Sequence, residues 1–173
     1  IVFSLRVPAA TLALWICACS RPAADSRFKV PPGFSVETAA APQLTGSIVA
    51  FTFDSLGRPV IAPEHKHPTI LLDKDGDGTF DTLKVFSDKV NNLQGLWFDG
   101  RVLYAVGNNA EGQCGLYRLE DTDGDDTADT FEQINRFEQS MGEHGPHDIR
   151  RGPDGHPTLM LGNHTGVPRE LIE

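Results

Sequence analysis

The chain has 173 residues, enough for one well-buried domain, and a formal net charge of −9. Two Asp-rich segments, 73–81 and 121–129, together hold nine aspartates, so the acidity is local. Because the sequence contains no cluster of Lys and Arg, the electrostatic footprint of a nucleic-acid-binding protein is missing, and we expect no nucleic-acid partner.

Residues 1–19 predict an export signal with a lipobox-like end. Arg6 precedes a short apolar run that finishes in small residues and is too short to span a bilayer comfortably. In Ile16-Cys17-Ala18-Cys19 an aliphatic residue stands three positions before Cys19, which predicts lipidation of Cys19. The lipid would anchor the protein to a membrane, in the periplasm or at the cell surface. Ordinary cleavage after Ala24, without a lipid, is the alternative.

Residues 20–32, rich in Pro, Ala and charge, predict a linker between the membrane and a folded domain. The chain opens on Ile1 and stops shortly after a predicted strand, so we expect residues 33–173 to be the N-terminal part of a longer domain. If Cys17 leaves with the signal and Cys19 is acylated, Cys114 is the one remaining thiol and no internal disulfide forms. The sequence has no Cys-x-x-Cys-His motif for covalent haem.

An internal repeat organises the chain after the linker. The segment 73–81 returns as 121–129, and 121 − 73 = 48. A second element, a strand, a tight turn and a strand, recurs in phase around residues 54–57, 99–100 and 152–155. A period in this range is typical of β-propeller blades. Since no long segment has helical periodicity, the sequence predicts an all-β fold.

One repeat accommodates four short strands: the two strands of the hairpin around Asp99-Gly100, residues 115–120 and residues 130–135. Four strands per repeat make a propeller blade, so we expect about two and a half blades in this chain. Residues 34–37 alternate in character and are expected to form a further strand that helps to close the ring. A β-sandwich with two similar hairpins is the alternative.

The two Asp-rich segments predict calcium loops. Each carries carboxylates at positions one, three, five and nine, with a backbone carbonyl available at position seven, and oxygen ligands in this number indicate Ca²⁺. Gly78 permits a sharp turn at position six, whereas Asp126 in the second loop predicts a strained or altered turn and a weaker site. An acidic turn without metal is the alternative. The predicted ligands are Asp73, Asp75, Asp77, Thr79 and Asp81, and then Asp121, Asp123, Asp125, Thr127 and Asp129.

Three histidines flank the third hairpin. His144 and His147 stand at the start of its first strand, and His164 follows its second strand, next to Asn163. Because the two strands of a hairpin are antiparallel, residues before the first strand and after the second lie at the same end. We therefore expect His144 to be a neighbour of Asn163 and His164.

From about Phe28 to its end, the chain resembles the quinoprotein glucose and sorbosone dehydrogenase-like propellers, in particular the planctomycete and verrucomicrobial membrane-bound dehydrogenase proteins, which join a six-bladed propeller to helical repeats and a cytochrome c domain. The motifs that carry the resemblance are Pro31-Pro32-Gly33-Phe34, the paired Asp loops, Gly142-Glu143-His144-Gly145-Pro146-His147, Gly152-Pro153-Asp154-Gly155 and Gly162-Asn163-His164.

The resemblance implies a six-bladed propeller, pyrroloquinoline quinone (PQQ) as cofactor, a sugar or alcohol substrate and a cytochrome c electron acceptor. In this family the general base is a His eight residues before the Gly of a Gly-Pro-Asp turn, and 152 − 8 = 144 places His144 there. Asn163 stands where the family has the Asp that orients this His, and His147 replaces a small Gly. Glu143 completes the candidate catalytic set, while His147 and His164 are candidate cofactor contacts.

Three functions stay open on this evidence. The first is a PQQ-dependent dehydrogenase with His144 as base. The second is a non-catalytic, calcium-stabilised propeller that docks a partner or a haem domain. The third is a transition-metal site made of His144, His147 and His164. The quinone-binding Arg and Lys of the family are expected beyond Glu173.

Overall fold

The computed structural model describes residues 27–138 and 144–166. The predicted signal with Cys19, much of the predicted linker and Glu143 lie outside the described residues. The chain divides into two units, of which the first comprises Ile1–Thr45 and Leu72–Thr82 and the second comprises Gly46–Leu71 and Leu83–Glu173. The first Asp loop belongs to the first unit, and the second Asp loop and the histidines belong to the second.

The described residues form an all-β protein, as the sequence predicts. Their only helix is a single turn, α1 (Pro42–Thr45), and no helix in this part of the chain has the length and apolar character needed to cross a membrane. The strands are β1 (Ile48–Phe53), β2 (Pro59–Pro63), β3 (Thr69–Leu72), β4 (Thr82–Val85), β5 (Val90–Asp99), β6 (Val102–Asn109), β7 (Cys114–Glu120), β8 (Thr130–Arg136), β9 (Pro146–Arg151) and β10 (Pro157–Leu161).

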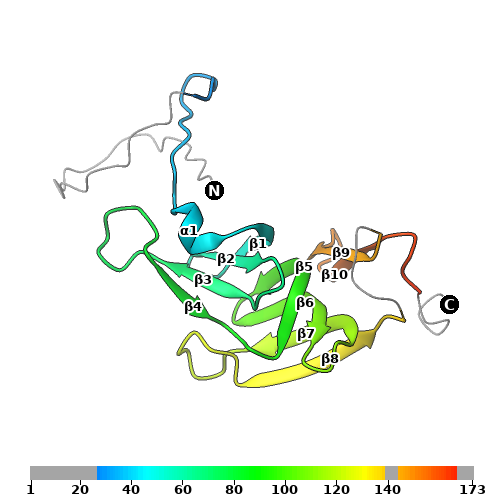
Figure 1. Ribbon diagram of the computed structural model, residues 1–173. Helices are drawn as coiled ribbons and strands as arrows, with labels where there is room; N and C mark the ends of the chain where they lie inside the picture. Colours follow the sequence, from blue (N-terminus) through cyan, green and yellow to red (C-terminus); the bar gives the residue numbers. More distant parts are fainter. Residues whose placement is uncertain (1–26, 139–143, 167–173) are drawn as a thin grey trace. The chain divides into compact units, whose positions relative to one another are not determined.

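The strands build two four-stranded antiparallel sheets and a hairpin (Figure 1). In chain order, β1 to β4 form the first sheet and β5 to β8 the second, with each strand hydrogen-bonded to the next, and β9 pairs with β10. The prediction of four consecutive strands per repeat is thereby confirmed for both repeats. In the described part of the chain, no sheet closes on itself.

Short-range turn chemistry explains the regularity of the second sheet. Gly100, at φ 62°, makes the tight turn that pairs Asp99 with Val102 at the ends of β5 and β6. At the other end of β6 the side chain of Asn109 accepts hydrogen bonds from the backbone N–H groups of Glu111 (3.1 Å) and Gln113 (2.9 Å). These local bonds close the loop and start β7 in register with β6.

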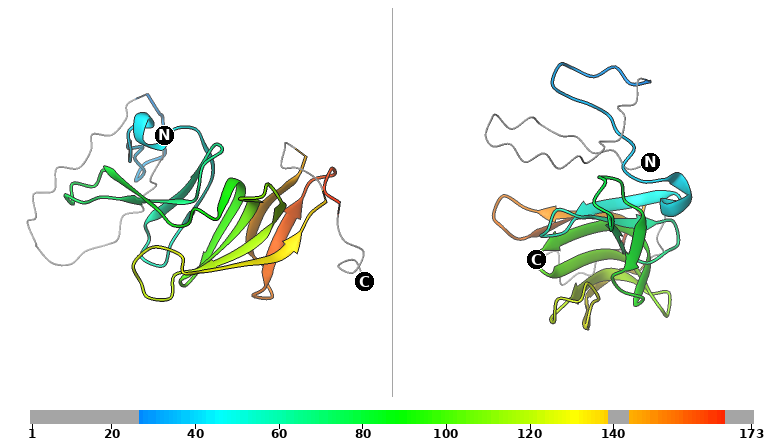
Figure 2. Two further views of the ribbon diagram at one scale, coloured as in Figure 1. Left: turned by 60° about the horizontal axis from the view of Figure 1, so that its bottom comes forward. Right: turned by 90° about the vertical axis from the view of Figure 1, so that its left-hand side faces the viewer.

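The second sheet packs against both the first sheet and the hairpin. β5 contacts β1 and also contacts β9, and Figure 2 shows β5 to β8 between the first sheet and the hairpin. Gly95 on β5 permits the approach of β9, because a Cβ at this position would lie 2.2 Å from the carbonyl oxygen of His147. The core at this contact consists of the buried residues Val106, Cys114, Leu116, Phe137 and Ile149, with Trp97, Tyr104, Leu159 and Leu161 packed against them.

Residues 34–37 do not form the predicted strand. The N–H of Phe34 donates to the carbonyl of Pro31 (3.2 Å) in a turn with Gly33 at φ 89°, and the next residues carry no strand. Instead, Ala40 forms an isolated parallel bridge with Phe80. Four alternating residues are too few to specify a partner strand, whereas the small, buried side chain of Ala40 allows its backbone to approach the first Asp loop.

Candidate functional site

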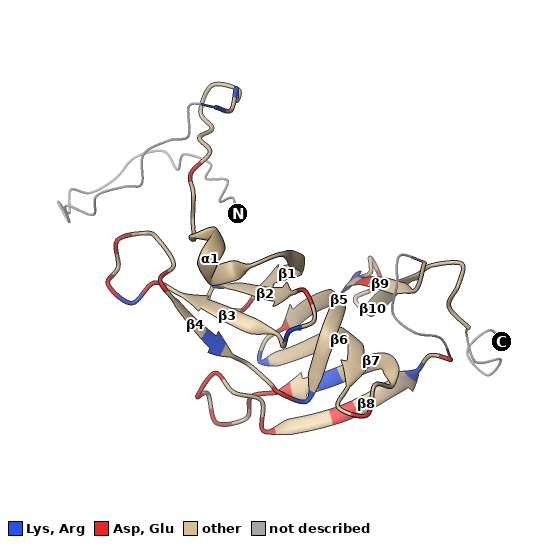
Figure 3. Cartoon of the chain, viewed as in Figure 1, with Lys and Arg blue, Asp and Glu red and all other residues tan. Residues whose placement is uncertain are grey.

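The first Asp loop brings three carboxylates together. Oxygen atoms of Asp73, Asp75 and Asp77 lie within 4.8 Å of one another. Asp73 shapes the loop from within, because its carboxylate accepts hydrogen bonds from the N–H groups of Gly76 (2.8 Å), Asp77 (3.2 Å) and Gly78 (2.9 Å). Figure 3 shows the acidic residues concentrated in this loop, between β3 and β4, and in the loop between β7 and β8.

The second loop repeats this backbone one period later. Oδ1 of Asp121 accepts from Gly124 N–H (2.6 Å) and Oδ2 from Asp126 N–H (3.0 Å), as Asp73 accepts from Gly76 and Gly78. Both loops also have the bond from the seventh residue to the carboxylate of the fifth, Thr79 N–H to Asp77 (2.7 Å) and Thr127 N–H to Asp125 (2.8 Å). The two segments are therefore equivalent structures as well as equivalent sequences.

The converging carboxylates differ between the loops. In the second loop they are Asp121, Asp123 and Asp129, at positions one, three and nine, whereas the first loop uses positions one, three and five. Asp129 is turned inward because its Oδ2 accepts hydrogen bonds from both the N–H and the hydroxyl of Thr122, each at 2.7 Å. Its counterpart Asp81 accepts from the hydroxyl of the following residue, Thr82 (2.7 Å).

Of the strained or altered turn predicted at position six, the structure shows a non-glycine residue at positive φ but no change in the course of the backbone. Asp126 takes φ 68°, in the positive range that Gly78 also occupies at φ 92°. Its N–H keeps the hydrogen bond to the first Asp of the loop, so the backbone is the same. Asp is among the non-glycine residues that tolerate this conformation, and here its side chain has a cationic partner, Arg58, at 2.5 and 2.8 Å.

Hydrogen bonds favour the ionised form of two loop carboxylates, Asp73 and Asp129. For Asp73, burial acts to raise the pKa, but the backbone N–H groups of Gly78, Gly76 and Asp77 outweigh it, and the pKa lies below its usual value. The hydrogen bonds from Thr122 lower the pKa of Asp129 in the same way. Each loop therefore contains one carboxylate, Asp73 or Asp129, whose ionised form is favoured by its hydrogen bonds.

The histidines at the hairpin end lie as the antiparallel geometry predicts. The rings of His144 and His164 have centroids 4.6 Å apart with their planes inclined by 55°. Backbone bonds hold them there, from His164 N–H to the carbonyl of His144 (2.9 Å) and from Gly162 N–H to the carbonyl of Gly145 (2.8 Å). Gly162 is required for this approach, because a Cβ there would lie 2.3 Å from the carbonyl oxygen of His144.

The other described residues predicted at this end of the hairpin do not join His144 and His164 in one site. Asn163 is exposed, and the described structure shows no hydrogen bond from its amide to His144, which contacts His164 instead. His147 is half-buried on β9. His144, His147 and His164 do not form a group of converging ligand atoms; in the described residues the two such groups are the aspartate triads. Glu143 lies outside the described residues.

A family model matches most of the chain. The family is described as a domain of unknown function, DUF7133, and the match covers residues 20–171, which include both sheets, both Asp loops and the histidine hairpin. The chain belongs to the DUF7133 family. No curated protein and no solved structure matches it.

A group of residues beside the second loop of this DUF7133 domain was not predicted from the sequence. A pocket of about 230 Å³ opens there, and Asp54, Arg58, Arg101 and Asp126 are among its lining residues. Arg58 joins Asp54 to Asp126, which is far along the chain in another sheet. The one sign of this group in the sequence is Asp126, which stands where the first loop has Gly. The sequence alone indicates a weaker metal site there and does not indicate a contact with Arg58.

Proposed function

We propose that this DUF7133 domain binds two calcium ions, one in each Asp loop, and that the ions stiffen successive blades of a β-propeller. The observation that carries the proposal is the equivalence of the two loops, which have the same hydrogen bonds one repeat apart and three converging carboxylates each. Because both loops have this backbone and each brings three negative carboxylates together, we expect both to bind the same kind of ligand, a cation.

The donor atoms fit calcium. Each triad offers carboxylate oxygens alone, which are the ligands of a hard cation, and the carbonyls of Thr79 and Thr127 would add one oxygen each. Carboxylates held within 4.8 Å repel one another by about 1 kcal/mol per pair even in water. A divalent cation bound between them would offset this electrostatic repulsion. Magnesium prefers a rigid octahedron with retained waters and fits a flexible side-chain cage less well.

The propeller arrangement is supported by the order and packing of the sheets. Each repeat is a four-stranded meander, and the first strand of the second meander packs against the first strands of the preceding meander and of the following hairpin. First strands that stack in chain order are the inner strands of propeller blades. Six blades in the complete ring remain part of the proposal.

Calorimetric titration of calcium-free protein tests the metal proposal. We expect two equivalents of Ca²⁺, of which Asp73→Asn removes one and Asp121→Asn removes the other, because each variant loses the carboxylate that organises its loop. The control is Asp88→Asn, an exposed aspartate outside both loops. The proposal fails if no calcium binds, or if binding is indifferent to the two loop variants.

We propose as a second candidate that the hairpin end oxidises a hydroxyl group of a sugar or alcohol, with His144 as the base. The specific observation in its favour is the contact of His144 with His164, which concentrates two imidazoles at an exposed end of the hairpin. An imidazole accepts a proton near neutral pH, and a second ring beside it orients the first. When bound, PQQ would supply the hydride acceptor, and a cytochrome c would take the electrons onward.

The residues present fit the quinone only in part. His144, His147 and His164 offer hydrogen-bonding groups to a polar ring. The guanidinium groups on β9 are engaged elsewhere, since Arg150 donates to the carbonyl of Leu96 (2.9 Å) and Arg151 to that of Gly155 (3.4 Å). Cations for the quinone carboxylates would have to come from other parts of the protein. If they do not, the docking of a haem domain is favoured over oxidation of a hydroxyl group.

An activity assay separates these functions. Full-length protein supplied with calcium and PQQ is expected to reduce an artificial electron acceptor when sugars are added, and His144→Ala is expected to abolish the reduction. His156→Ala, in the turn at the opposite end of the hairpin, is the matched control and should leave the rate unchanged. Quinone binding without turnover on any sugar or alcohol would favour the docking function. A transition metal bound in protein purified without added metal, and lost in His144→Ala, would favour the metal site.

A further inference from the structure

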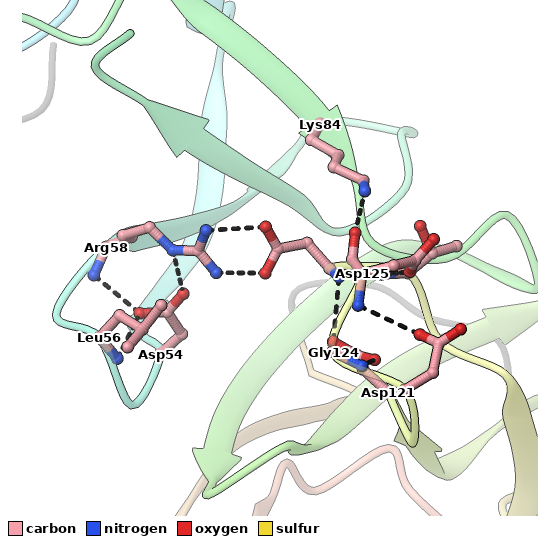
Figure 4. A network of polar contacts seen from close by, with 10 residues as sticks. Asp54, Leu56, Arg58, Lys84, Asp121, Gly124 and Asp125 are labelled. Carbon is pink, nitrogen blue, oxygen red and sulfur yellow. Dashed lines mark hydrogen bonds and ion pairs between the residues drawn. The ribbon is translucent and has the colours of Figure 1, made fainter.

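The second Asp loop is attached to the first sheet by a set of contacts that span the two sheets. Arg58, just before β2, donates from Nη1 to Oδ2 of Asp126 (2.8 Å) and from Nη2 to Oδ1 (2.5 Å), which is a bidentate pair. Lys84 on β4 donates to the carbonyl of Asp125, and Ala128 N–H donates to the carbonyl of Phe86 (2.7 Å). Figure 4 shows Arg58 and Lys84 both directed at the loop.

The guanidinium of Arg58 is held before it reaches the loop. Its Nε donates to Oδ2 of Asp54 (2.6 Å), and Oδ1 of Asp54 accepts from the N–H groups of Leu56 (3.0 Å) and Arg58 (2.8 Å). The Asp54 side chain is only 5% exposed, against 25% for Arg58 and 31% for Asp126. A guanidinium fixed by a buried carboxylate loses little entropy when it binds a second one. We call Asp54, Arg58 and Asp126 the inter-sheet clamp.

Asp126 connects the clamp to the predicted metal ligands. Its side chain binds Arg58, and its own N–H donates to Oδ2 of Asp121, the first residue of the carboxylate triad. The position of Asp121 is thereby tied to the preceding sheet through one residue.

The first loop lacks this connection. Its sixth residue is Gly78, which has no side chain to bind a cation. The other attachment is shared, because Phe80 N–H donates to the carbonyl of Ala39 (2.7 Å) as Ala128 N–H donates to Phe86. The two loops therefore share the hydrogen bonds of Gly76 and Gly78, or Gly124 and Asp126, to the first Asp and the same kind of main-chain tie. They differ in the clamp, in the Lys84 contact and in the hydrogen bonds from Thr122 to Asp129.

We propose that the inter-sheet clamp stabilises the ligand-binding shape of the second loop without metal, whereas the first loop keeps that shape by its own hydrogen bonds alone and opens more often until calcium binds. The part of this inference that concerns calcium binding rests on the proposed function. Arg58 and Asp126 act as positioning residues. At position six, where the first loop has a flexible Gly, the side chain of Asp126 binds Arg58 of the neighbouring sheet. Calcium occupancy of the second loop is then coupled to the packing of the two sheets.

Hydrogen exchange in calcium-free protein tests the clamp. We expect the amides of Gly124, Asp126 and Thr127 to exchange about 10-fold more slowly than those of Gly76, Gly78 and Thr79, which make the same local bonds. In the double variant Arg58→Gln/Asp126→Asn, which leaves the net charge unchanged, the second loop should exchange about 10-fold faster and the first loop should not change. The control is Asp88→Asn/Lys89→Gln, an exposed ion pair of equal charge.

Two further measurements keep the test decisive. Asp126→Gly removes the side-chain contact while retaining a residue suited to positive φ, and it should give the same loss of protection without disturbing β7. Calorimetry on the double variant should show calcium affinity about 5-fold to 10-fold weaker at the second site and unchanged at the first. Equal exchange of the two loops in calcium-free wild-type protein, or an unchanged second loop in both variants, would overturn the clamp.

The exchange experiment and the calcium titration fail separately. Absence of calcium binding would contradict the proposed function. The hydrogen-exchange rates of the two loops in calcium-free protein would still support or overturn the clamp. Conversely, two calcium equivalents with no effect of the double variant on exchange or affinity would uphold the proposed function and reject the clamp.

Discussion

The two Asp loops are one structure held in two ways. Residues 73–81 and 121–129 have the same hydrogen bonds from the first carboxylate to the chain, and both have a residue at positive φ in position six. They differ in that Gly78 gives the first loop no side chain at this position, while Asp126 gives the second loop a partner in another sheet. A single side chain at a shared turn geometry therefore gives the second loop a side-chain contact to another sheet that Gly78 cannot give the first.

The largest expected effect concerns the strands that precede the loops. Leu71 and Leu119 occupy equivalent positions, since 119 − 71 = 48, and both are 0% exposed. We expect Leu71→Ala and Leu119→Ala each to lower the free energy of unfolding by about 2–5 kcal/mol, because each leaves a cavity in a packed sheet. Urea unfolding with calcium present measures both.

Leu83→Ala is the control for this pair, because the side chain of Leu83 is 37% exposed and its loss should cost about 1 kcal/mol or less. Losses of similar size for the two buried leucines would support equivalent repeats. A small loss at Leu71 alone would show that the first sheet is packed less tightly than the second.

A smaller effect is expected when the first loop is given the residue of the second. Gly78→Asp places a side chain at φ 92°, without the arginine that binds Asp126, and should lower the free energy of unfolding by about 1–2 kcal/mol. Gly78→Asn has the same shape without the charge and separates backbone strain from electrostatic repulsion. Thermal unfolding in calcium-free buffer measures both variants, and a Gly78→Asp protein as stable as the wild type would mean that the first loop already has a partner.

The smallest effect uses a reporter in the second sheet. Burial raises the pKa of Cys114, at the start of β7, to about 11. In the unfolded chain a thiol ionises at about pH 8.5, so between that pH and 11 the unfolded chain has lost a proton that the folded protein retains. Stability should therefore fall as pH rises through this window, by about 1 kcal/mol at pH 9.

Urea unfolding from pH 8 to 10 checks this prediction, with Cys114→Ala as the variant in which the contribution disappears. The second sheet should also protect Cys114 from alkylation at pH 8. Rapid alkylation of the folded protein would show that the β7 end of the second sheet opens easily, and would weaken the contrast between the two regions.

Local sequence patterns were sufficient for the repeat and for most of each loop. The spacing of the Asp loops, the turn residues such as Gly100 and the carboxylates at odd positions can all be seen in the sequence, and the structure confirms four strands per repeat. Of the four carboxylates predicted as ligands in each loop, three converge. The antiparallel pairing of one hairpin was also enough to place His144 beside His164. The strand predicted at residues 34–37 was wrong because a short alternating segment does not specify its partner.

What the tertiary structure alone decided is how the second loop is held and which carboxylates converge in each loop. The clamp joins residues that are distant in the chain, and it forms because β1 packs against β5, a contact that no pattern within one loop encodes. Asp81 and Asp129 have the same position in the motif, yet only Asp129 turns inward, since Thr122 occupies the place that Lys74 has in the first loop. The sequence by itself thus determined the backbone of both loops through short-range hydrogen bonds, and sheet packing determined how the second loop is attached.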